Sequence, residues 1–510
     1  MAIVVSHVAG DFDALAARAL RQAPLGDLIE LRLDRIGHPG EERLRELVRA
    51  SPKPLIVTLH GPEAFGTFAG SADELCETLL AAARAGASFV DVDWTLSLEL
   101  GEVEGKCHRI VSRHDTEGTP EDLAAFEEEV REVLYEGDLI KLVPHARSTA
   151  DGLRVLRHLR RARGGLVAFC SGAKGSFTRV LAPIFGSPFT YAASAELPGM
   201  ESGEPTAPGQ LRVNDLRALL PPGGLGPETA VFGVVGRPLG HSLSPWVHGM
   251  ALKGAHLDAV YLAFEIDDLD AFLDLADDEN FRGFSVTAPF KEAAFARSRP
   301  SDEACERVRA CNTLVRDGAG WRGYNTDLGA IEQTLERAFR VHAKEPGRPQ
   351  GLGAARVLVL GTGGAARAAL GAATRAGARA TVAGRSPERA AALARELGAE
   401  AIGWDAVARA EYDVLVHCTP VGTGVGTGDA RELPIPAEWI RPGTLVLDAV
   451  YRPIRTGLLA AARERGCLAV PGGEWFVRQA RDQFELFTRR APDEDLMRAA
   501  FERGVGGSPA

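Results

Sequence analysis

Two residues in the first half of the chain have the chemistry to form and use an imine. Lys141 stands in the segment DLIKLVP, where its neighbours are apolar. Burial disfavours the charged form of an amine, and a neutral lysine can attack a ketone to give a Schiff base. His114 ends the preceding apolar segment, HRIVSRHD, where it could move protons beside such an imine. A solvated lysine and a structural histidine are the alternatives, but the two residues together favour proton transfer at a carbonyl compound.

Other ionisable residues interrupt segments of the first half that should be buried. Glu30 and Arg32 in LIELRLD are two residues apart, so on a strand their side chains share one face. His60 follows VTL, and Arg179 lies in SFTRV. Charged side chains near the carboxyl ends of barrel strands usually mark an active site. For Glu30 and Arg32 the alternative is an internal ion pair that only fills space.

The second half contains another candidate proton-transfer pair. Lys291 lies in SVTAPFKE and Asp327 lies in GYNTD. GHSLSP places Ser242 and Ser244 two residues apart in a turn bounded by glycine, and Thr287 ends the strand-like run before Lys291. Hydroxyl, carboxylate and amine groups of this kind suit a polyhydroxylated ligand. Each motif is weak alone, and their order along the chain is what favours a binding site.

A glycine-rich turn follows the apolar run VLVL directly. Gly361, Gly363 and Ala366 in GTGGAARAAL form the pattern G-x-G-x-x-A. Between a strand and a helix, this pattern allows a tight turn, close approach of the backbone, and a helix N-terminus for a pyrophosphate. It therefore predicts a dinucleotide site.

The next strand-like segment ends in AGRSPER, which predicts the form of that dinucleotide. A site for NAD usually has an acidic residue here for the ribose hydroxyl, but this chain has Arg385 and Ser386, with Arg389 one helical step further on. Arginine can bind a phosphate through two parallel hydrogen bonds, which favours NADP. The alternative is a plain surface, since only seven of the 58 basic residues are lysine and arginine is everywhere.

These residues lie on a regular alternation of elements. Residues 1–220 contain eight strand-like segments, most of them followed by a helical stretch, which predicts a (β/α)8 barrel. The segments are IVVSHV, LIELRLD, PLIVTLH, FVDVDW, HRIVSRHD, DLIKLVP, GLVAFCS and FTYAAS. Residues 221–229, rich in proline and glycine, are predicted to be a linker. A second α/β unit is expected from residue 230, with a parallel-sheet domain over 352–471.

The first half resembles the type I 3-dehydroquinate dehydratases. The matching segments are ELRLD, IVSRHD, DLIKLV, KGSFTRVLAP and TAPGQLRVNDL. The resemblance implies that Lys141 forms the imine and that His114 is the general base and acid. It also implies that further side chains hold the hydroxyls and carboxylate of the substrate, namely Ser6, Glu30, Arg32, Arg179 and Gln210. His60 stands where the family usually has arginine, and Thr206 stands where it often has serine, and both are included among the expected substrate contacts.

Residues 231–490 resemble the shikimate dehydrogenases. Beyond the motifs above, CNTLV, CTPVG, LVLDAVYRP and GGEWFVRQARDQFELFT match in order. The resemblance implies that Lys291 is the acid and base and that Asp327 is its partner. The implied contacts to shikimate are Ser242, Ser244, Thr287, Asn312, Tyr451 and Gln479. The implied contacts to NADP are Gly361, Thr362, Gly363, Gly364, Ala365, Arg385, Ser386, Arg389, Ala449 and Gly472. Departures from the family pattern, His417, Thr423 and Trp475 among them, are expected to reshape the nicotinamide pocket.

The chain is thus expected to be an α/β protein with an N-terminal (β/α)8 barrel and a two-domain shikimate-dehydrogenase-like unit with a Rossmann NADP-binding domain. The expected domains are the barrel (1–220), the linker (221–229), a shikimate-binding domain (230–345, completed by 472–500) and the Rossmann domain (352–471). The two reactions would be consecutive. A non-catalytic metabolite sensor on the same folds, which would have lost the catalytic lysines, and an NAD-linked quinate dehydrogenase are the alternatives.

Composition narrows the expected partners. The formal net charge is -11 with no basic stripe, which argues against nucleic acid. No apolar run is long enough to span a membrane, and the N-terminus does not resemble a signal peptide. Seven scattered cysteines without a C-x-x-C pair favour free thiols, a cytoplasmic location and no metal site. The expected ligands are 3-dehydroquinate, 3-dehydroshikimate and shikimate, and a homodimer is the only protein partner considered.

Overall fold

The computed structural model describes residues 1–103, 105–162, 164–196, 205–240, 242–342, 349–424 and 429–506. Contacts divide the chain into two compact units. One contains Met1–Thr229 with Ala271–Ala276, and the other contains Ala230–Asp270 with Asp277–Ala510. Across the described ranges, every helix is too short or too polar to cross a membrane.

The first unit is a nearly closed parallel barrel. Its strands are β1 (Ala2–His7), β2 (Leu28–Arg32), β3 (Leu55–Thr58), β4 (Phe89–Asp93), β5 (His108–Asp115), β6 (Leu139–Pro144), β7 (Leu166–Ala168) and β8 (Phe189–Ala193). They pair in the order β7-β6-β5-β4-β3-β2-β1-β8, and all seven pairings are parallel. The predicted barrel is confirmed.

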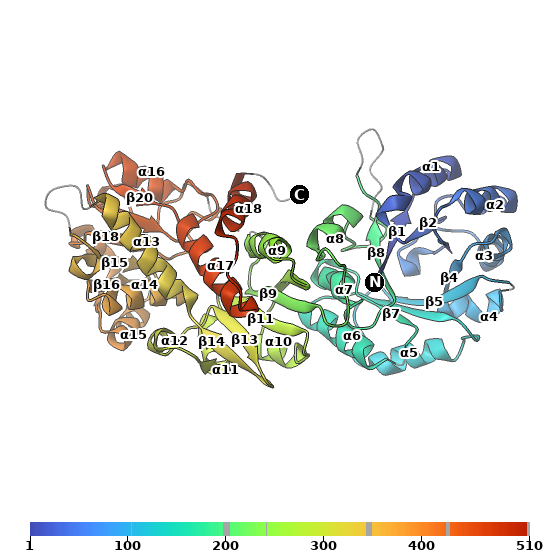
Figure 1. Cartoon of the computed structure of the whole chain (residues 1–510), viewed down its shortest axis with the longest axis horizontal. Helices are drawn as coiled ribbons and strands as arrows, with labels where there is room; N and C mark the ends of the chain where they lie inside the picture. The colour runs from blue at the N-terminus through green and yellow to red at the C-terminus, as the bar shows by residue number, and fades with distance from the viewer. Residues whose placement is uncertain are drawn as a thin grey trace. The chain divides into compact units, whose positions relative to one another are not determined.

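Helices between the strands cover the outside of this barrel (Figure 1). They are α1 (Phe12–Gln22), α2 (Glu41–Ala50), α3 (Ala72–Ala85), α4 (Ser97–Leu100), α5 (Leu123–Arg131), α6 (Thr149–Arg161), α7 (Ser176–Leu181) and α8 (Val213–Leu219). Helices α3 and α6 begin with complete capping boxes, at Ser71 and Ser148. In each box the serine hydroxyl accepts from the backbone N–H three residues later, and the acidic side chain there accepts from the backbone N–H of the serine. After β4 come a short 3-10 helix (Trp94–Leu96) and the four-residue α4.

The second unit contains two sheets, of which the first is mixed. It has the order β10-β9-β11-β13-β14-β12, with β13 antiparallel to both of its neighbours. The strands are β9 (Ala230–Gly236), β10 (Ala259–Glu265), β11 (Phe281–Val286), β12 (Arg299–Pro300), β13 (Thr313–Asp317) and β14 (Gly320–Tyr324). The helices of this part of the unit are α9 (Ser244–Gly254), α11 (Lys291–Arg297) and α12 (Glu303–Val308). Helix α10 (Leu269–Leu275) follows β10 in the chain, and most of its residues are assigned to the first unit.

The second sheet is entirely parallel and has the order β17-β16-β15-β18-β19-β20, the doubly wound pattern of dinucleotide-binding domains. Its strands are β15 (Arg356–Leu360), β16 (Arg379–Ala383), β17 (Glu400–Ile402), β18 (Val414–His417), β19 (Leu445–Asp448) and β20 (Leu468–Val470). The helices α13 (Thr326–His342), α14 (Gly364–Arg375), α15 (Pro387–Leu397) and α16 (Gly457–Glu464) accompany it. The predicted Rossmann domain is confirmed.

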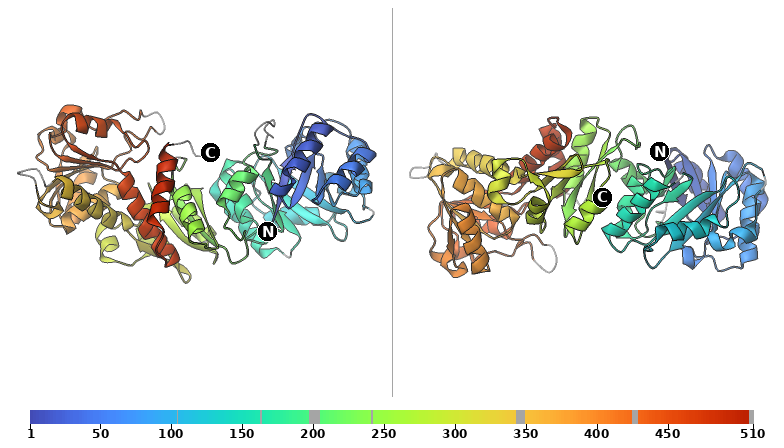
Figure 2. Two further views of the ribbon diagram at one scale, coloured as in Figure 1. Left: turned by 45° about the horizontal axis from the view of Figure 1, so that its top comes forward. Right: turned by 90° about the horizontal axis from the view of Figure 1, so that it is seen from below.

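After the second sheet, the chain returns to the first one. Helix α17 (Gly473–Thr488) packs on β11, β13 and α13, and α18 (Glu494–Gly506) packs on α9. Figure 2 shows these last helices, in red, beside the green strands of the first sheet. Phe476, Val477 and Phe484 of α17 enter the same hydrophobic core as Val234 of β9, so apolar burial holds the helix in place.

Candidate active sites

Lys141 projects from β6 into the barrel, where it is half of a buried ion pair. Its Nζ contacts the carboxylate of Asp91 on β4, and the exposed fractions are 5% for Lys141 and 0% for Asp91. The ring of Tyr191 lies 4.9 Å from the same nitrogen. The sequence predicts an amine among apolar residues, whereas the structure adds a carboxylate and an aromatic ring beside it. Asp91 could have been selected from the sequence, because it is an acidic residue inside the apolar strand segment FVDVD.

His60 lies behind this pair, not on the wall of the cavity. Its Nε2 is 3.2 Å from Oδ1 of Asp91, and its ring is 5.2 Å from the ring of His114. Burial by itself raises the pKa of Asp91, but Lys141 and His60 outweigh burial and hold that pKa below its usual range. Asp91 therefore stays ionised between its two partners, and His60 is a neighbour of Asp91 rather than a lining residue.

All the predicted catalytic and substrate-binding residues of the barrel except His60 line one cavity. The lining includes Ser6, Glu30, Arg32, His114, Lys141, Arg179, Thr206 and Gln210. Strand register explains part of this, because Ser6 of β1 lies opposite Glu30 of β2. Ser6 and Thr58 both donate hydrogen bonds to the Glu30 carboxylate, at 2.5 and 2.8 Å, and Gln210 donates to the Ser6 hydroxyl at 3.3 Å. This wall offers hydroxyl, amide and carboxylate groups to a ligand.

Arg179 is the clearest anion-binding group in the barrel cavity. It is 2% exposed, and its guanidinium carbon lies 4.3 Å from the centre of the Phe169 ring. Among the described residues, its Nε and Nη2 have no hydrogen-bond partner. By contrast, Arg32 donates to Asp34 at 2.6 and 2.9 Å. A buried guanidinium with unused donors is costly unless a ligand accepts from it, and a carboxylate would.

Burial, and after it the charge of Lys141, lowers the pKa of His114 well below the ordinary value of 6.5. The imidazole is therefore neutral at pH 6.5, the form that can accept a proton. We expect catalysis that uses this base to persist below pH 6.5 and to fall only as the pH drops through the lowered pKa. A profile of kcat/KM against pH for the barrel reaction measures this. An acid limb at 6.5 or above would contradict it.

The second cavity contains the second predicted pair. Lys291, the first residue of α11, donates from Nζ to Oδ2 of Asp327 at 2.6 Å, and Asp327 lies in the first turn of α13. The aliphatic stem of Lys291 packs on the start of α14, where a Cβ at Gly364 would lie only 2.7 Å from Cδ of the lysine. The glycine turn and the lysine are thus in direct contact.

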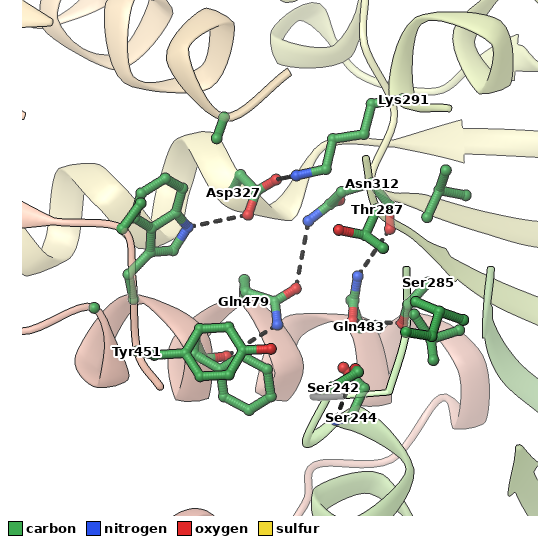
Figure 3. Close-up of a pocket in the computed structure, with 18 of the residues that line it drawn as sticks. Ser242, Ser244, Ser285, Thr287, Lys291, Asn312, Asp327, Tyr451, Gln479 and Gln483 are labelled. Atoms are coloured by element: carbon green, nitrogen blue, oxygen red, sulfur yellow. Dashed lines mark hydrogen bonds and ion pairs between the residues drawn. The ribbon is translucent and has the colours of Figure 1, made fainter. Parts of the chain in front are cut away.

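The predicted substrate residues of the second unit line the same cavity as this pair (Figure 3). They are Ser242, Ser244, Thr287, Asn312, Tyr451 and Gln479, in a cavity of about 210 Å³ that is open to solvent. Asn312 donates to Gln479 at 3.4 Å. Ser285, Gln483 and Trp475 also line the cavity and were absent from the expected substrate contacts. Ser285 and Gln483 are hydrogen-bonded to each other at 2.7 Å although they are 198 residues apart.

The glycine turn of the second sheet fits a pyrophosphate. Gly361 has φ 121°, a conformation that favours glycine, and a Cβ on Gly363 would meet nothing within 4 Å. Gly363 precedes α14 and supplies no side-chain cap, so N–H groups of the first turn are open to an anion. Ala365, Ala449 and Gly472 line the same cavity as Lys291 and Asp327, which brings this turn next to the predicted pair.

The turn after β16 carries the two arginines predicted to select NADP. Arg385 and Arg389 are exposed, and within the described ranges no ion pair engages either of them. The Ser386 hydroxyl caps α15, since it accepts from the backbone N–H of Arg389 at 3.3 Å. A Cβ at Gly384 would lie 2.6 Å from Thr362, so this turn packs directly on the glycine turn. A phosphate on the adenosine ribose would find two uncommitted guanidinium groups here.

His417, one of the departures, is buried at the end of β18. Its Nδ1 lies 2.9 Å from Oδ1 of Asp448 at the end of β19, and its Nε2 lies 2.5 Å from the Thr419 hydroxyl. Asp448 also accepts from Thr456 at 2.6 Å. The histidine therefore holds the CTPVG turn to the neighbouring strand.

Three family models match the chain. Residues 3–222 match type I 3-dehydroquinase, and residues 234–314 match the shikimate dehydrogenase substrate binding domain. Residues 356–423 match a model described as NADP oxidoreductase, coenzyme F420-dependent.

Individual relatives match one or both units. The chloroplastic bifunctional 3-dehydroquinate dehydratase/shikimate dehydrogenase of Arabidopsis thaliana is 33% identical over 513 residues, which cover 96% of this chain and 82% of that protein. A shikimate dehydrogenase (NADP(+)) of Acidiphilium cryptum is 40% identical over 275 residues, covering 52% of this chain and 94% of the relative. Among solved structures, shikimate 5-dehydrogenase of Thermus thermophilus in complex with NADP(H) and shikimate is 33% identical, with a TM-score of 0.45, and covers 54% of this chain and 99% of that one.

Proposed function

Because the chain belongs to the family of bifunctional 3-dehydroquinate dehydratases/shikimate dehydrogenases, we propose that it catalyses two consecutive reactions. The barrel converts 3-dehydroquinate to 3-dehydroshikimate, and the second unit reduces 3-dehydroshikimate to shikimate with NADPH. The observation that carries the proposal is that each unit has its own cavity built around a paired lysine. These pairs are Lys141 with Asp91 and Lys291 with Asp327.

In the barrel, Lys141 passes a proton to His114, and its neutral Nζ attacks the substrate ketone. The resulting carbinolamine takes that proton back on its hydroxyl group, which leaves as water to form an iminium ion. The iminium withdraws electrons, so the neighbouring C–H becomes acidic and neutral His114 accepts its proton. The β-hydroxyl then leaves as water with a proton returned from His114. Hydrolysis of the imine restores Lys141. Asp91 balances the positive charge of the iminium nitrogen, and Arg179 donates hydrogen bonds to the substrate carboxylate.

In the second unit, Lys291 holds a proton for the carbonyl oxygen of 3-dehydroshikimate. NADPH supplies a hydride to the carbonyl carbon when it is bound. As the oxygen gains negative charge, Nζ donates its proton, so that the carbonyl becomes a hydroxyl. Asp327 orients Nζ at 2.6 Å, and the hydroxyl groups of Ser242, Ser244 and Thr287 bind those of the substrate.

The two alternatives are less well supported. A non-catalytic sensor would have no need of two catalytic lysines, and both are present and paired with carboxylates. A quinate dehydrogenase that uses NAD would need a ribose-binding acid after β16, where this chain has the uncommitted Arg385 and Arg389.

A coupled assay tests the proposal. Purified protein given 3-dehydroquinate and NADPH should oxidise NADPH and accumulate shikimate, whereas 3-dehydroquinate alone should stop at 3-dehydroshikimate. The proposal would be refuted if NADPH were oxidised but quinate were the only product. It would also be refuted if neither 3-dehydroquinate nor NADPH reacted.

Arg385 is expected to set the preference for NADP. A charge-assisted contact to the 2′-phosphate contributes about 1.5–3 kcal/mol, or roughly a ten- to hundredfold change in affinity. Arg385→Ala should therefore raise KM for NADPH by about that factor and leave KM for NADH nearly unchanged, and the double variant with Arg389→Ala should lose more. Steady-state kinetics with both cofactors measures this, with Arg395→Ala, an exposed arginine near the end of α15, as control. Equal weakening of both cofactors would show that Arg385 is an ordinary surface residue.

Further parts of the proposal concern organisation and location. We propose that residues 1–220 form the dehydratase, residues 221–229 the linker, residues 230–345 with 472–500 the shikimate-binding domain, and residues 352–471 the NADP-binding domain.

A cytoplasmic location is favoured by seven free cysteines, since reduced thiols suit a reducing compartment. A homodimer is the proposed alternative to a monomer, and light scattering distinguishes the two.

A further inference from the structure

The catalytic carboxylate of the second unit has a second donor besides Lys291. The indole N–H of Trp475 donates to Oδ1 of Asp327 at 3.0 Å, while Lys291 donates to Oδ2 at 2.6 Å. Each oxygen of Asp327 thus has its own partner. Asp327 is 4% exposed and Trp475 is 5% exposed, so solvent competes little with either hydrogen bond.

Packing holds the indole in this position. Trp475 is the third residue of α17, and its ring belongs to the hydrophobic core that includes Leu328 of α13 and Ala366 of α14. Asp327 precedes Leu328 directly, so the residue that carries the carboxylate and the ring that contacts it are fixed to the same core. An indole cannot rotate its N–H away without leaving that core.

A carboxylate held by one donor can rotate about its terminal bond, because sp³–sp² torsions are broad. A second donor on the other oxygen removes that freedom. The ammonium group of Lys291 is then held in one orientation toward the cavity. A group that donates a proton to a carbonyl oxygen needs such a fixed orientation. A methionine at position 475 could fill the same space but has no N–H to donate.

We infer that Trp475 is a positioning residue for the reduction, acting through Asp327 on Lys291. This inference rests on the proposed function of the second unit. A ring that only packed, or only formed a wall for the cofactor, would affect folding or the KM for NADPH. A residue that positions the proton donor affects kcat instead.

The test compares Trp475→Phe, which keeps an aromatic ring and removes the N–H, with wild type. We expect kcat for reduction of 3-dehydroshikimate to fall about tenfold, equivalent to about 1.4 kcal/mol. The KM values for 3-dehydroshikimate and NADPH should stay within about twofold. Trp475→Met should behave like Trp475→Phe in kcat. Trp439→Phe is the matched control, since Trp439 packs on a different core and should leave kcat unchanged.

A double-mutant cycle separates positioning from packing. In an Asp327→Ala background the indole has no carboxylate to hold, so Trp475→Phe should cost less than twofold in kcat. A full tenfold loss in that background, an unchanged kcat in the single variant, or a loss confined to the KM for NADPH would each overturn the inference. Circular dichroism and thermal unfolding of the same samples report on folding of the second unit. A wild-type protein that fails to reduce 3-dehydroshikimate would refute the proposed function instead.

Discussion

Replacing Lys141 by alanine should abolish dehydration of 3-dehydroquinate and leave reduction of added 3-dehydroshikimate near the wild-type rate. The loss should be on the order of 10⁴-fold or more, because the variant has no amine to form the imine on which the later steps depend. The reductase should be unaffected, because its paired lysine and its cavity belong to the other unit. Separate assays with each substrate measure both rates.

Chemical trapping adds a readout at the level of the atom. Borohydride added with 3-dehydroquinate or 3-dehydroshikimate should reduce the imine and leave a stable mass on the peptide that contains Lys141. The exposed Lys106 is the control: Lys106→Ala should keep both the activity and the adduct. Inactivation without a mass on that peptide, or loss of both activities in a folded Lys141→Ala variant, would contradict the assignment or the independence of the two sites.

Lys291→Ala should produce the opposite pattern. We expect reduction to fall by about 10²–10⁴-fold, the usual contribution of a positioned general acid, while dehydration stays at wild type. The effect should be in kcat, since Ser242, Ser244 and Thr287 remain to bind the substrate. Lys253→Ala, a lysine-to-alanine change on α9 outside the cavity, is the control. A variant with normal kcat and a raised KM would show that Lys291 only binds substrate.

The sequence predicts the fold well because its signals are local. Apolar runs separated by helical stretches indicate both parallel sheets, and the glycine turn after VLVL indicates where the second one binds a dinucleotide. Residues that stand out by type in such a run, Lys141 and Glu30 for instance, could be selected without coordinates.

What the sequence did not reveal depends on distant pairings. Asp91 meets Lys141 across 50 residues, and Trp475 meets Asp327 across 148. Ser285 and Gln483 look like ordinary residues of a strand and a helix until α17 returns to the first sheet. His60 stands at the sequence position of an expected substrate contact. In the structure its Nε2 lies beside the Asp91 carboxylate, which Lys141 also contacts, and His60 does not line the cavity.

The return of α17 has a consequence for the order in which the protein becomes active during synthesis. Trp475, Gln479 and Gln483 reach their cavity from a helix made after every strand of both sheets. A ribosome that has just completed β20 has therefore already produced all the residues of the barrel cavity, but the reductase cavity still lacks one wall. The enzyme for the first reaction can mature while the nascent chain is still growing, and the enzyme for the second must wait for α17 to leave the exit tunnel.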